Sequence, residues 1–355
     1  MFDASFYCGK RVVVTGHTGF KGSWLCQILK RAGAIVTGYA LEAPSDPALF
    51  ALANVAEGMT SIIGDIADLD SLWKAFDAAK PEIVLHLAAQ PIVRESYRDP
   101  VGTYRTNVMG TVNILECIRK STTVRSFLNV TTDKVYENRE WVWGYREDER
   151  LDGFDPYSNS KSCSELVTSS YKRSFFADGA VAISTARAGN VIGGGDFAAD
   201  RIVPDCVRAA ASGKEILIRN PYSIRPYQHV LEPLFLYLTI AQKQYENGAL
   251  AGNYNVGPDD ADCATTGALA DLFTTAWGNG LAWTNGNEGG PHEANILKLD
   301  CAKVKQTFGW RPVWDLSVAI EKVVEWSKVW LAGGDVAACM DAQIAAYRAD
   351  AEKKK

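Results

Sequence analysis

The sequence has no long apolar run and few histidines. No stretch approaches the roughly 18 consecutive apolar residues of a membrane-spanning helix. The first ten residues, MFDASFYCGK, lack the basic, apolar and small-residue order of a signal peptide. The 4 histidines in 355 residues are far apart, which gives no reason to propose a zinc site. We therefore expect no metal, no membrane partner and a cytoplasmic location.

Cysteine pairs and an excess of one charge are also missing. The 8 cysteines are scattered without any CxxC spacing, so we predict reduced thiols that serve packing. Lys and Arg number 37 and Asp and Glu 42, a net charge of −5, which gives no indication of a nucleic-acid partner. What is present, 47% hydrophobic and 22% charged residues, is typical of a globular protein with a large core.

Short β-branched runs alternate with helical patterns through the first half of the chain. Several of these runs are apolar at nearly every position, as in strands buried on both faces of a parallel sheet. The alternation predicts an α/β fold with a doubly wound parallel sheet of the Rossmann type. Strands are predicted at 11–15, 34–40, 60–65, 82–88, 125–131 and 180–187, and helices near 20–32, 68–79, 101–119 and 157–176.

The rhythm of strands and helices breaks after about residue 188. Glycine, proline and aspartate gather there in GNVIGGGDFAADRIVP, and shorter elements follow. We predict a Rossmann domain over 8–187. A smaller region over 188–335 is interleaved with it and mainly binds substrate. Residues 336–355 are predicted to form a C-terminal tail that frays at its AEKKK end.

A glycine motif follows the first predicted strand. In VVVTGHTGFKGSWL, Gly16, Gly19 and Gly22 lie where the first helix begins. Glycine allows a tight turn and lets a pyrophosphate approach the N–H groups at a helix start. The alternative is a turn that is merely rich in glycine. The segment HLAAQ (86–90) favours a cofactor, because its small residues end the fourth strand where a flat ring could lie.

The ends of the second and third strands bear on the choice of dinucleotide. Ala40 and Leu41 end the second strand, and no Arg or Lys follows that could bind a 2′-phosphate, which favours NAD over NADP. Glu42 is a weak candidate for the ribose and equally a solvated loop acid. Asp65 closes the third predicted strand and could accept a hydrogen bond from an adenine amino group, or could cap a helix.

The chain contains one Tyr-x-x-x-Lys pattern, Tyr157 and Lys161 in DPYSNSKSCSELV. Residues four apart lie on one face of a helix. A lysine ammonium beside a phenol lowers the phenol pKa, so the tyrosine can act as a base. Most such pairs are surface residues of a helix. The place of this one, after the glycine motif and after a fifth strand that ends in threonine, predicts a catalytic pair.

These motifs together resemble the extended short-chain dehydrogenase/reductase family. Longer segments are similar to that family's nucleotide-sugar 4,6-dehydratases, in the branch that acts on CDP-glucose, and the resemblance covers roughly residues 8 to 335. The segments are TGHTGFKGSWL, HLAAQPIVRESY, TNVMGTVNILE, TTDKVYENREWVWGYRE, DPYSNSKS, RAGNVIGGGDFAADRIVPD and IRNPYSIRPYQHVLEPL.

The resemblance implies a lyase that holds NAD tightly and converts CDP-D-glucose to CDP-4-dehydro-6-deoxy-D-glucose. The reaction oxidises C4, eliminates water across C5 and C6, and returns the hydride to C6. Such a product feeds deoxysugar assembly for bacterial surface polysaccharide such as the lipopolysaccharide O-antigen. The rivals are a nucleotide-sugar 4-epimerase, a dehydratase of another nucleoside-diphospho-hexose, and a catalytically silent NAD-binding regulator.

The resemblance also assigns roles in FLNVTTDKVYENREW, at 127–141. Tyr157 would remove the O4 proton, Lys161 would support it and hold the nicotinamide ribose, and Thr132 would bind O4. Asp133 would be the acid that expels the C6 hydroxyl. Lys134 would remove the C5 proton, or would remain charged and stabilise the enolate. Related dehydratases of other nucleotide sugars carry a carboxylate here, so Lys134 is a departure. A surface ion pair is the structural alternative.

Three further sets of contacts are implied. Helices near 101–119 and 157–176 would form a four-helix bundle in a homodimer, or would simply pack on the sheet. For His229 and for His292, a packed core position is an equal alternative to a substrate contact. The substrate contacts would be Gln90, Asn190, Arg201, Arg219, Arg225, His229 and His292. The cofactor contacts would be Gly16, Thr18, Gly19, Phe20, Gly22, Asp65, Ile66, Leu87, Ala88, Ala89, Thr106, Tyr157 and Lys161.

Overall fold

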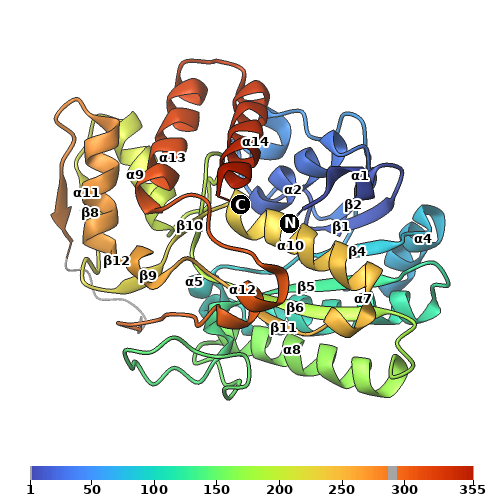
Figure 1. Ribbon diagram of the computed structural model, residues 1–355. Helices are drawn as coiled ribbons and strands as arrows, with labels where there is room; N and C mark the ends of the chain where they lie inside the picture. The colour runs from blue at the N-terminus through green and yellow to red at the C-terminus, as the bar shows by residue number, and fades with distance from the viewer. Residues whose placement is uncertain (1, 287–293, 355) are drawn as a thin grey trace.

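A sheet of seven strands forms the centre of the computed structural model, which describes residues 2–286 and 294–354. Every strand pairing in it is parallel, in the order β11-β6-β5-β4-β1-β2-β3 (Figure 1). This confirms the predicted doubly wound sheet. The strands are β1 Arg11–Thr15, β2 Ile35–Ala40, β3 Thr60–Ile63, β4 Ile83–His86, β5 Ser126–Thr132, β6 Ala182–Ala188 and β11 Asn253–Val256.

Helices cover both faces of the sheet, and the alternation of side chains along each strand explains the two cores. Val12 and Val14 of β1 join the core under α2, α10 and α14 (Val336–Lys353), while Val13 joins the core under α4 and α7. Successive side chains of a strand point to opposite faces, so an all-apolar strand is buried on both. The helices are α1 Ala4–Tyr7, α2 Phe20–Arg31, α3 Leu49–Leu52, α4 Leu69–Ala79, α5 Val93–Arg98, α6 Pro100–Tyr104, α7 Gly110–Lys120, α8 Pro156–Phe175 and α10 Leu231–Glu246.

The predicted helix near 101–119 is interrupted. The π-helical segment η1, Arg105–Met109, separates α6 from α7. Asn107 in this segment donates to the Gln90 carbonyl at 3.0 Å and to Ser160 Oγ at 2.9 Å, and accepts from the Gln90 backbone N–H at 2.9 Å. These bonds join the helix to the end of β4 and to α8. A π-turn inside a helix often marks a functional site.

The second half of the chain adds small strand pairs and a third core. Its elements β11 and α10 belong to the main sheet layers, whereas α9, α11 and α13 pack together at the other end of the molecule (Figure 1). The remaining elements are β7 Val191–Ile192, α9 Ile202–Ala211, β8 Ile216–Ile218, β9 Ile224–Pro226, β10 Gln228–His229, β12 Cys263–Thr265, α11 Thr266–Trp277, β13 Trp283–Asn285, α12 Ala302–Phe308, α13 Leu316–Leu331, and the short 3-10 turns η2 Asp133–Val135, η3 Gly248–Leu250 and η4 Asp260–Asp262.

Residues 336–353 form the helix α14, Val336–Lys353, where the sequence analysis predicts a tail. Val336, Met340, Ile344 and Tyr347 recur at helical spacing and are buried in the core with α2 and α10. Asp335 caps the helix by accepting from the Ala338 N–H at 2.9 Å. The AEKKK segment, which the sequence analysis predicts to fray, is therefore helical as far as Lys353.

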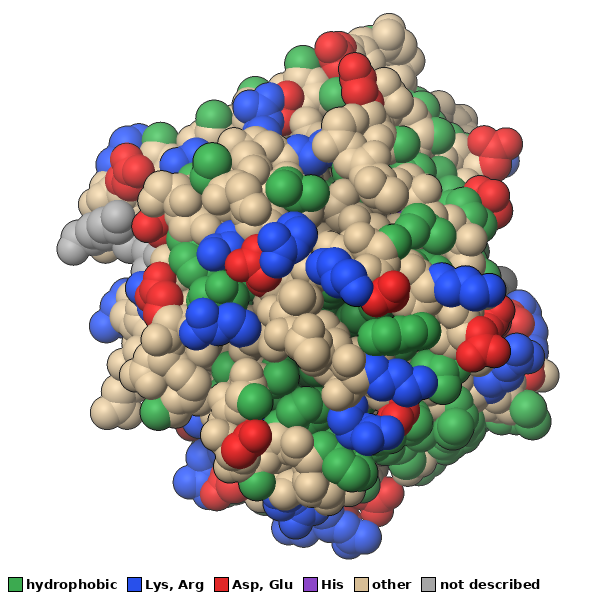
Figure 2. Space-filling model, turned by 90° about the vertical axis from the view of Figure 1, so that its right-hand side faces the viewer, with side chains coloured by type: hydrophobic (Ala, Val, Ile, Leu, Met, Phe, Trp, Pro, Cys, Tyr) green, Lys and Arg blue, Asp and Glu red, His purple; other side chains and the backbone are tan. Residues whose placement is uncertain are grey.

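The surface carries mixed charge. On the face that lies to the right in Figure 1, basic and acidic side chains alternate with apolar ones (Figure 2). Of the 8 cysteines, all free, Cys26, Cys117, Cys206, Cys301 and Cys339 are buried. Within residues 2–286 and 294–354, no helix combines the length and the apolar character that a bilayer crossing needs, and no cluster of His, Cys, Asp or Glu could hold a metal ion.

Candidate active site

The glycine motif forms a turn with almost no free space around it. Gly16 has φ +75°, and a Cβ there would lie 2.8 Å from the backbone nitrogen of Ala88. A Cβ on Gly22 would lie 2.1 Å from the Gly16 carbonyl oxygen. Both positions therefore require glycine, because the end of β1, the start of α2 and the residues after β4 touch through their backbones.

The start of α2 is open to an anion. Its N-cap is Gly19, which has no side chain to bond the free N–H groups of the first turn. A helix start with free N–H groups attracts phosphate. Leu87, Ala88 and Ala89 follow β4 beside this turn and are partly exposed. The residues therefore fit a dinucleotide whose pyrophosphate lies at the start of α2.

The other residues considered as cofactor contacts differ in their surroundings. Asp65 lies two residues after β3, accepts from the Ala67 N–H at 2.9 Å, and forms an ion pair with Arg105 at 3.7 Å, whereas the residue that caps α4 is Asp68. Thr18 donates to the Leu41 carbonyl at 2.9 Å. Ile66 is buried, and Thr106 lies partly buried in η1. Glu42 is exposed beyond β2.

Thr132, Asp133 and Lys134 lie together where β5 ends. Thr132 Oγ1 donates to Asp133 Oδ1 at 2.9 Å and accepts from the Lys134 N–H at 3.4 Å. Asp133 is buried, and its Oδ2 has no hydrogen-bond partner within the described residues. Burial raises the Asp133 pKa, against the opposing charges of Lys134 and Arg225 and the bond from Thr132. Burial therefore favours the protonated form of this carboxyl.

Tyr157 and Lys161 lie in the first turns of α8, near the end of β5. Burial raises the Tyr157 pKa to about 12, although a hydrogen bond with Thr132 opposes the change. The net direction is opposite to the one that the sequence analysis predicts from the Tyr-x-x-x-Lys spacing. The reason is that loss of water contact outweighs the effects of Thr132 and of the charge of Arg201, which lower the Tyr157 pKa. Lys161 donates to the Val130 carbonyl at 3.2 Å, and burial followed by the charge of Lys21 lowers the Lys161 pKa to about 7.

Two neighbours of these groups are absent from the predicted set. Lys21, in the first turn of α2, interacts electrostatically with Asp133 and Lys161. Tyr237 of α10 is fully buried, its hydroxyl has no partner in the described ranges, and it interacts with Tyr157 and Asp133. Lys21 stands inside the glycine motif, so its charge was a signal in the sequence. Tyr237 lies in an apolar helix and gives no such signal.

The predicted arginines have acidic or backbone partners. Arg201 pairs with Asp196 at 2.9 Å, and Arg219 pairs with Asp200 at 3.0 Å. Arg94, which was not predicted, contacts the same Asp200 carboxylate at 3.4 Å. The guanidinium of the buried Arg225 donates to the carbonyls of Ile224 and Ala294 and lowers the pKa of Asp133.

The other predicted substrate residues differ in their surroundings. His229 is fully buried between Trp24 and Trp314, with ring centroids at 6.2 and 5.0 Å, and burial lowers its pKa to about 3. This is the packed core position that was the alternative for it. Gln90 bonds Thr103 Oγ1 at 2.8 Å, and Asn190 is partly buried beside β7. His292 lies outside the described residues.

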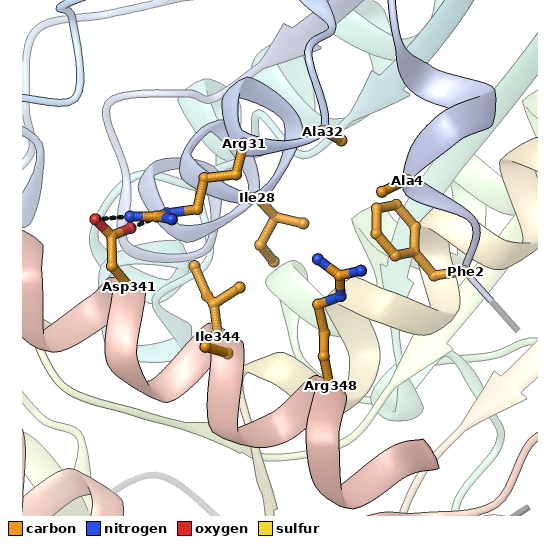
Figure 3. A pocket seen from close by; sticks show the side chains of 9 residues that line it. Phe2, Ala4, Ile28, Arg31, Ala32, Asp341, Ile344 and Arg348 are labelled. Carbon is orange, nitrogen blue, oxygen red and sulfur yellow. Dashed lines mark hydrogen bonds and ion pairs between the residues drawn. The ribbon is translucent and has the colours of Figure 1, made fainter.

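Two hollows in the surface lie apart from the catalytic side chains. One, of about 490 Å³, is lined by Tyr104, Asp155, Asn159 and neighbours at the start of α8. The other, of about 120 Å³, lies between α1, α2 and α14, where Arg31 pairs with Asp341 and Arg348 points toward Phe2 (Figure 3). Neither is lined by Thr132, Tyr157 or Lys161.

Comparison with known proteins places this arrangement in a family. The model of the family described as GDP-mannose 4,6 dehydratase matches residues 13–323. A CDP-glucose 4,6-dehydratase from Salmonella typhimurium is 49% identical over 353 residues, which cover 98% of each chain. A dTDP-glucose 4,6-dehydratase from Streptomyces antibioticus is 29% identical and covers 89% of this chain and 91% of its own.

Solved structures show the same fold at lower identity. A Thermus thermophilus UDP-glucose 4-epimerase in complex with NAD has a TM-score of 0.78 and 24% identity, over 90% of this chain and 99% of that one. A Bacillus anthracis dTDP-glucose 4,6-dehydratase in complex with NAD has a TM-score of 0.75 and 19% identity, over 90% and 97%. The fold is therefore shared by dehydratases and epimerases.

Proposed function

The chain belongs to the GDP-mannose 4,6-dehydratase family, and from this premise we propose that it is an NAD-dependent CDP-D-glucose 4,6-dehydratase. The product would be CDP-4-dehydro-6-deoxy-D-glucose. One observation carries the proposal: Thr132 ends β5, and Asp133 and Lys134 follow it directly in η2, close to Tyr157. Oxidation at C4 needs only the threonine and the tyrosine with its lysine, so the acid and the base that follow Thr132 are in excess of what an oxidation or epimerisation uses.

The first half of the reaction belongs to Tyr157 and its neighbours. Bound NAD would supply the hydride acceptor for C4, the hydride donor for C6, and a positive charge near the phenol. Tyr157 removes the O4 proton, and Thr132, which lies close to the tyrosine, orients the hydroxyl. Lys161 lies one helical turn after Tyr157, where an ammonium favours the phenolate.

The elimination belongs to Asp133 and Lys134. Because burial raises the Asp133 pKa, the carboxyl can carry the proton that the departing C6 hydroxyl takes. Lys134 is partly buried and follows directly, so it can remove the C5 proton or can stabilise the enolate as an ammonium. The structural support is that the carboxyl is buried and that its Oδ2 has no hydrogen-bond partner among the described residues.

The cofactor preference follows from the end of β2. Ala40 is buried, and the exposed Leu41 and Glu42 follow it. These three residues therefore include no cation that could bind a 2′-phosphate. We expect NAD⁺ to bind cofactor-free protein more tightly than NADP⁺, as measured by calorimetric titration with each. Tighter binding of NADP⁺ would overturn this assignment.

The choice of CDP-glucose rests on the 49% identity to the Salmonella enzyme. Arg201, Arg219 and Arg225 supply the charge that a nucleoside diphosphate requires. The test is incubation with CDP-, dTDP-, UDP- and GDP-glucose, followed by detection of the alkali-sensitive 4-keto sugar. CDP-glucose should give the highest kcat/KM. Faster turnover of another nucleotide would move the chain to a different dehydratase, and an epimerised hexose without keto product would favour the epimerase.

A homodimer is proposed from the exposed apolar residues on neighbouring helices. Val101, Met109, Leu166 and Phe175 are 77%, 52%, 55% and 51% exposed. Joining these faces of two chains would build a bundle of four helices and cover apolar surface. Light scattering should report a dimer for the wild type and for Leu331→Lys, and a monomer for Leu166→Lys. A monomeric wild type contradicts the proposal.

The free thiols fit a cytoplasmic enzyme.

A further inference from the structure

Arg187 of β6 and Glu165 of α8 form an ion pair in the interior of the protein. The two side chains are 1% and 2% exposed, and Nε and Nη2 of the guanidinium each donate to one carboxylate oxygen at 3.0 Å. Thr185 of β6 also donates to this carboxylate at 2.7 Å, and has Asn253 Oδ1 at 3.1 Å as a second acceptor. Taking both charges out of water costs about as much as their attraction returns, so the positions that the pair fixes explain it better than stability does.

The carboxylate of Glu165 joins α8 to the end of β5. It accepts from Thr131 Oγ1 at 2.5 Å, and Thr131 directly precedes Thr132, the last residue of the strand. Lys161 lies one turn earlier on the same face of α8 and donates to the Val130 carbonyl at 3.2 Å. Two consecutive residues of β5 are therefore bonded to side chains on consecutive turns of α8.

The guanidinium of Arg187 joins the ion pair to the chain that follows η2. Its Nη1 donates to the Tyr136 hydroxyl at 2.8 Å, and its Cζ lies 5.0 Å from the centre of the Tyr136 ring. The Tyr136 hydroxyl donates in turn to Asn255 Oδ1 of β11 at 2.6 Å. Because Tyr136 directly follows η2, Thr131 and Tyr136 flank the turn 132–135. Both residues that flank the turn are therefore bonded to one buried ion pair.

We propose that Arg187 and Glu165 are positioning residues of the proposed dehydration. Their ion pair bonds both residues that flank the turn 132–135, which carries the proposed acid and base, and joins that turn to α8, which carries Tyr157. This role rests on the proposed function, whereas the effect of the pair on the turn does not depend on any substrate. A displacement of about 1 Å between reacting groups can lower a rate about 10²-fold. The pair thus acts on catalysis through the turn and not on the reacting atoms.

The first variant removes both charges together, because loss of one partner alone would leave an unpaired charge in the interior. Glu165→Leu with Arg187→Met, the apolar variant, replaces the pair by apolar side chains, a change that is often neutral for stability. The Thr131 hydroxyl keeps the Ala186 carbonyl, at 3.5 Å, as an acceptor, and the Tyr136 hydroxyl keeps its acceptor on β11. The apolar variant should therefore unfold at nearly the same urea concentration as the wild type.

The second variant keeps the ion pair and removes its two contacts with the residues that flank the turn. Thr131→Val with Tyr136→Phe, the hydroxyl-free variant, retains the shape of both side chains. The matched control is Gln244→Leu near the start of β5, where Gln244 Nε2 donates to Ser126 Oγ at 2.8 Å and to the Phe127 carbonyl at 3.0 Å. Gln244 is as buried as the ion pair, so its loss should lower stability without affecting the turn.

Amide hydrogen exchange of the full-length protein, followed by mass spectrometry, is the direct test. In both variants the amides of residues 131–136 should exchange faster by about tenfold or more, because the bonds that hold this segment closed are gone. Gln244→Leu should leave the segment at the wild-type rate. Wild-type exchange of residues 131–136 in the folded apolar variant overturns the proposal. If the apolar variant does not fold, the hydroxyl-free variant decides by the same measurement.

Turnover of CDP-glucose separates positioning from support of the fold. In the apolar variant kcat should fall about 10²-fold, while KM and the affinity for NAD⁺ should stay at the wild-type values, because the proposed contacts of both ligands are unchanged. A folded apolar variant with wild-type kcat means that the pair is structural and overturns the positioning role. If the wild type turns over no nucleotide sugar, the proposed function fails, and hydrogen exchange still decides whether the pair holds the turn.

Discussion

The proposed cofactor end of the site is built from backbone, whereas the proposed substrate end is built from charged side chains. At the cofactor end, Gly16 and Gly22 let three backbone segments touch, and a Cβ on Gly22 would overlap with the Gly16 carbonyl. At the substrate end, Arg201 and Arg219 are held by Asp196 and Asp200. The glycine turn tolerates almost no substitution, because a side chain there would overlap with backbone. In the arginine–aspartate pairs, one pair can be replaced while the other stays in place. A shared fold can thus keep its cofactor and change its sugar.

The largest effect is expected between the two ends, at Tyr157. Tyr157→Phe removes the base for the first oxidation, so kcat should fall by about 10² to 10⁴-fold. Tyr171→Phe on the same helix is the matched control, because its hydroxyl bonds Glu116 at 2.9 Å, away from β5. Near-normal turnover by Tyr157→Phe would mean that the pair with Lys161 is structural.

A methyl group at the cofactor end should be nearly as damaging. Gly22→Ala places a Cβ against the Gly16 carbonyl, so the turn must shift. Forced overpacking costs about 1 to 3 kcal/mol of unfolding free energy, and NAD⁺ affinity should fall with it. Urea unfolding and NAD⁺ titration measure the two effects. Gly248→Ala, whose Cβ would meet nothing within 4 Å, is the control. If the two variants bind NAD⁺ equally well, the backbone account of this end is wrong.

A single substitution at the substrate end should have a smaller effect. Arg219→Gln removes one charge-assisted bond to a diphosphate, worth about 1.5 to 3 kcal/mol, so KM for CDP-glucose should rise about tenfold or more. The affinity for NAD⁺ should not change. Arg173→Gln on the exposed side of α8 provides the comparison. An unchanged KM in Arg219→Gln would remove this arginine from the diphosphate site.

The same contrast explains how much the sequence predicts. The strands, the glycine turn and the Tyr157–Lys161 spacing depend on neighbours in the chain, and the structure has them close to the predicted bounds. The pairing of Arg94 and Arg219 through Asp200 joins segments far apart in sequence, so no local pattern predicts it. The π-turn at Asn107 depends on Gln90 and Ser160 in the same way. The direction of the Tyr157 pKa needs burial, which spacing alone does not give.

The smallest effect on activity is expected at a buried carboxyl outside the site. Glu232 accepts from the N–H groups of Val313 and Trp314 and from the Tyr347 hydroxyl. Burial raises its pKa to about 7. An acid whose pKa is raised by folding favours the folded state most at low pH. Stability should therefore decline as the pH rises from the usual value for glutamate, about 4.3, toward 7.

Urea unfolding at about pH 5 and about pH 8 measures this decline. Glu232→Gln keeps an acceptor for both N–H groups and has no charge, so its unfolding free energy should vary less with pH. Its kcat should equal that of the wild type. An equal pH dependence in the two proteins would mean that Glu232 ionises as easily when folded as when unfolded.

Exchange of the C5 proton with deuterated water tests the central claim most directly, namely that the acid and base after Thr132 serve elimination. Asp133→Asn and Lys134→Met should both still oxidise C4 of CDP-glucose and accumulate the absorbance of reduced nicotinamide. Asp133→Asn should exchange the C5 proton, and Lys134→Met should not. Exchange by Lys134→Met at the wild-type rate would leave the lysine an electrostatic role only. Loss of product without any accumulated reduced nicotinamide in either variant would contradict the elimination account.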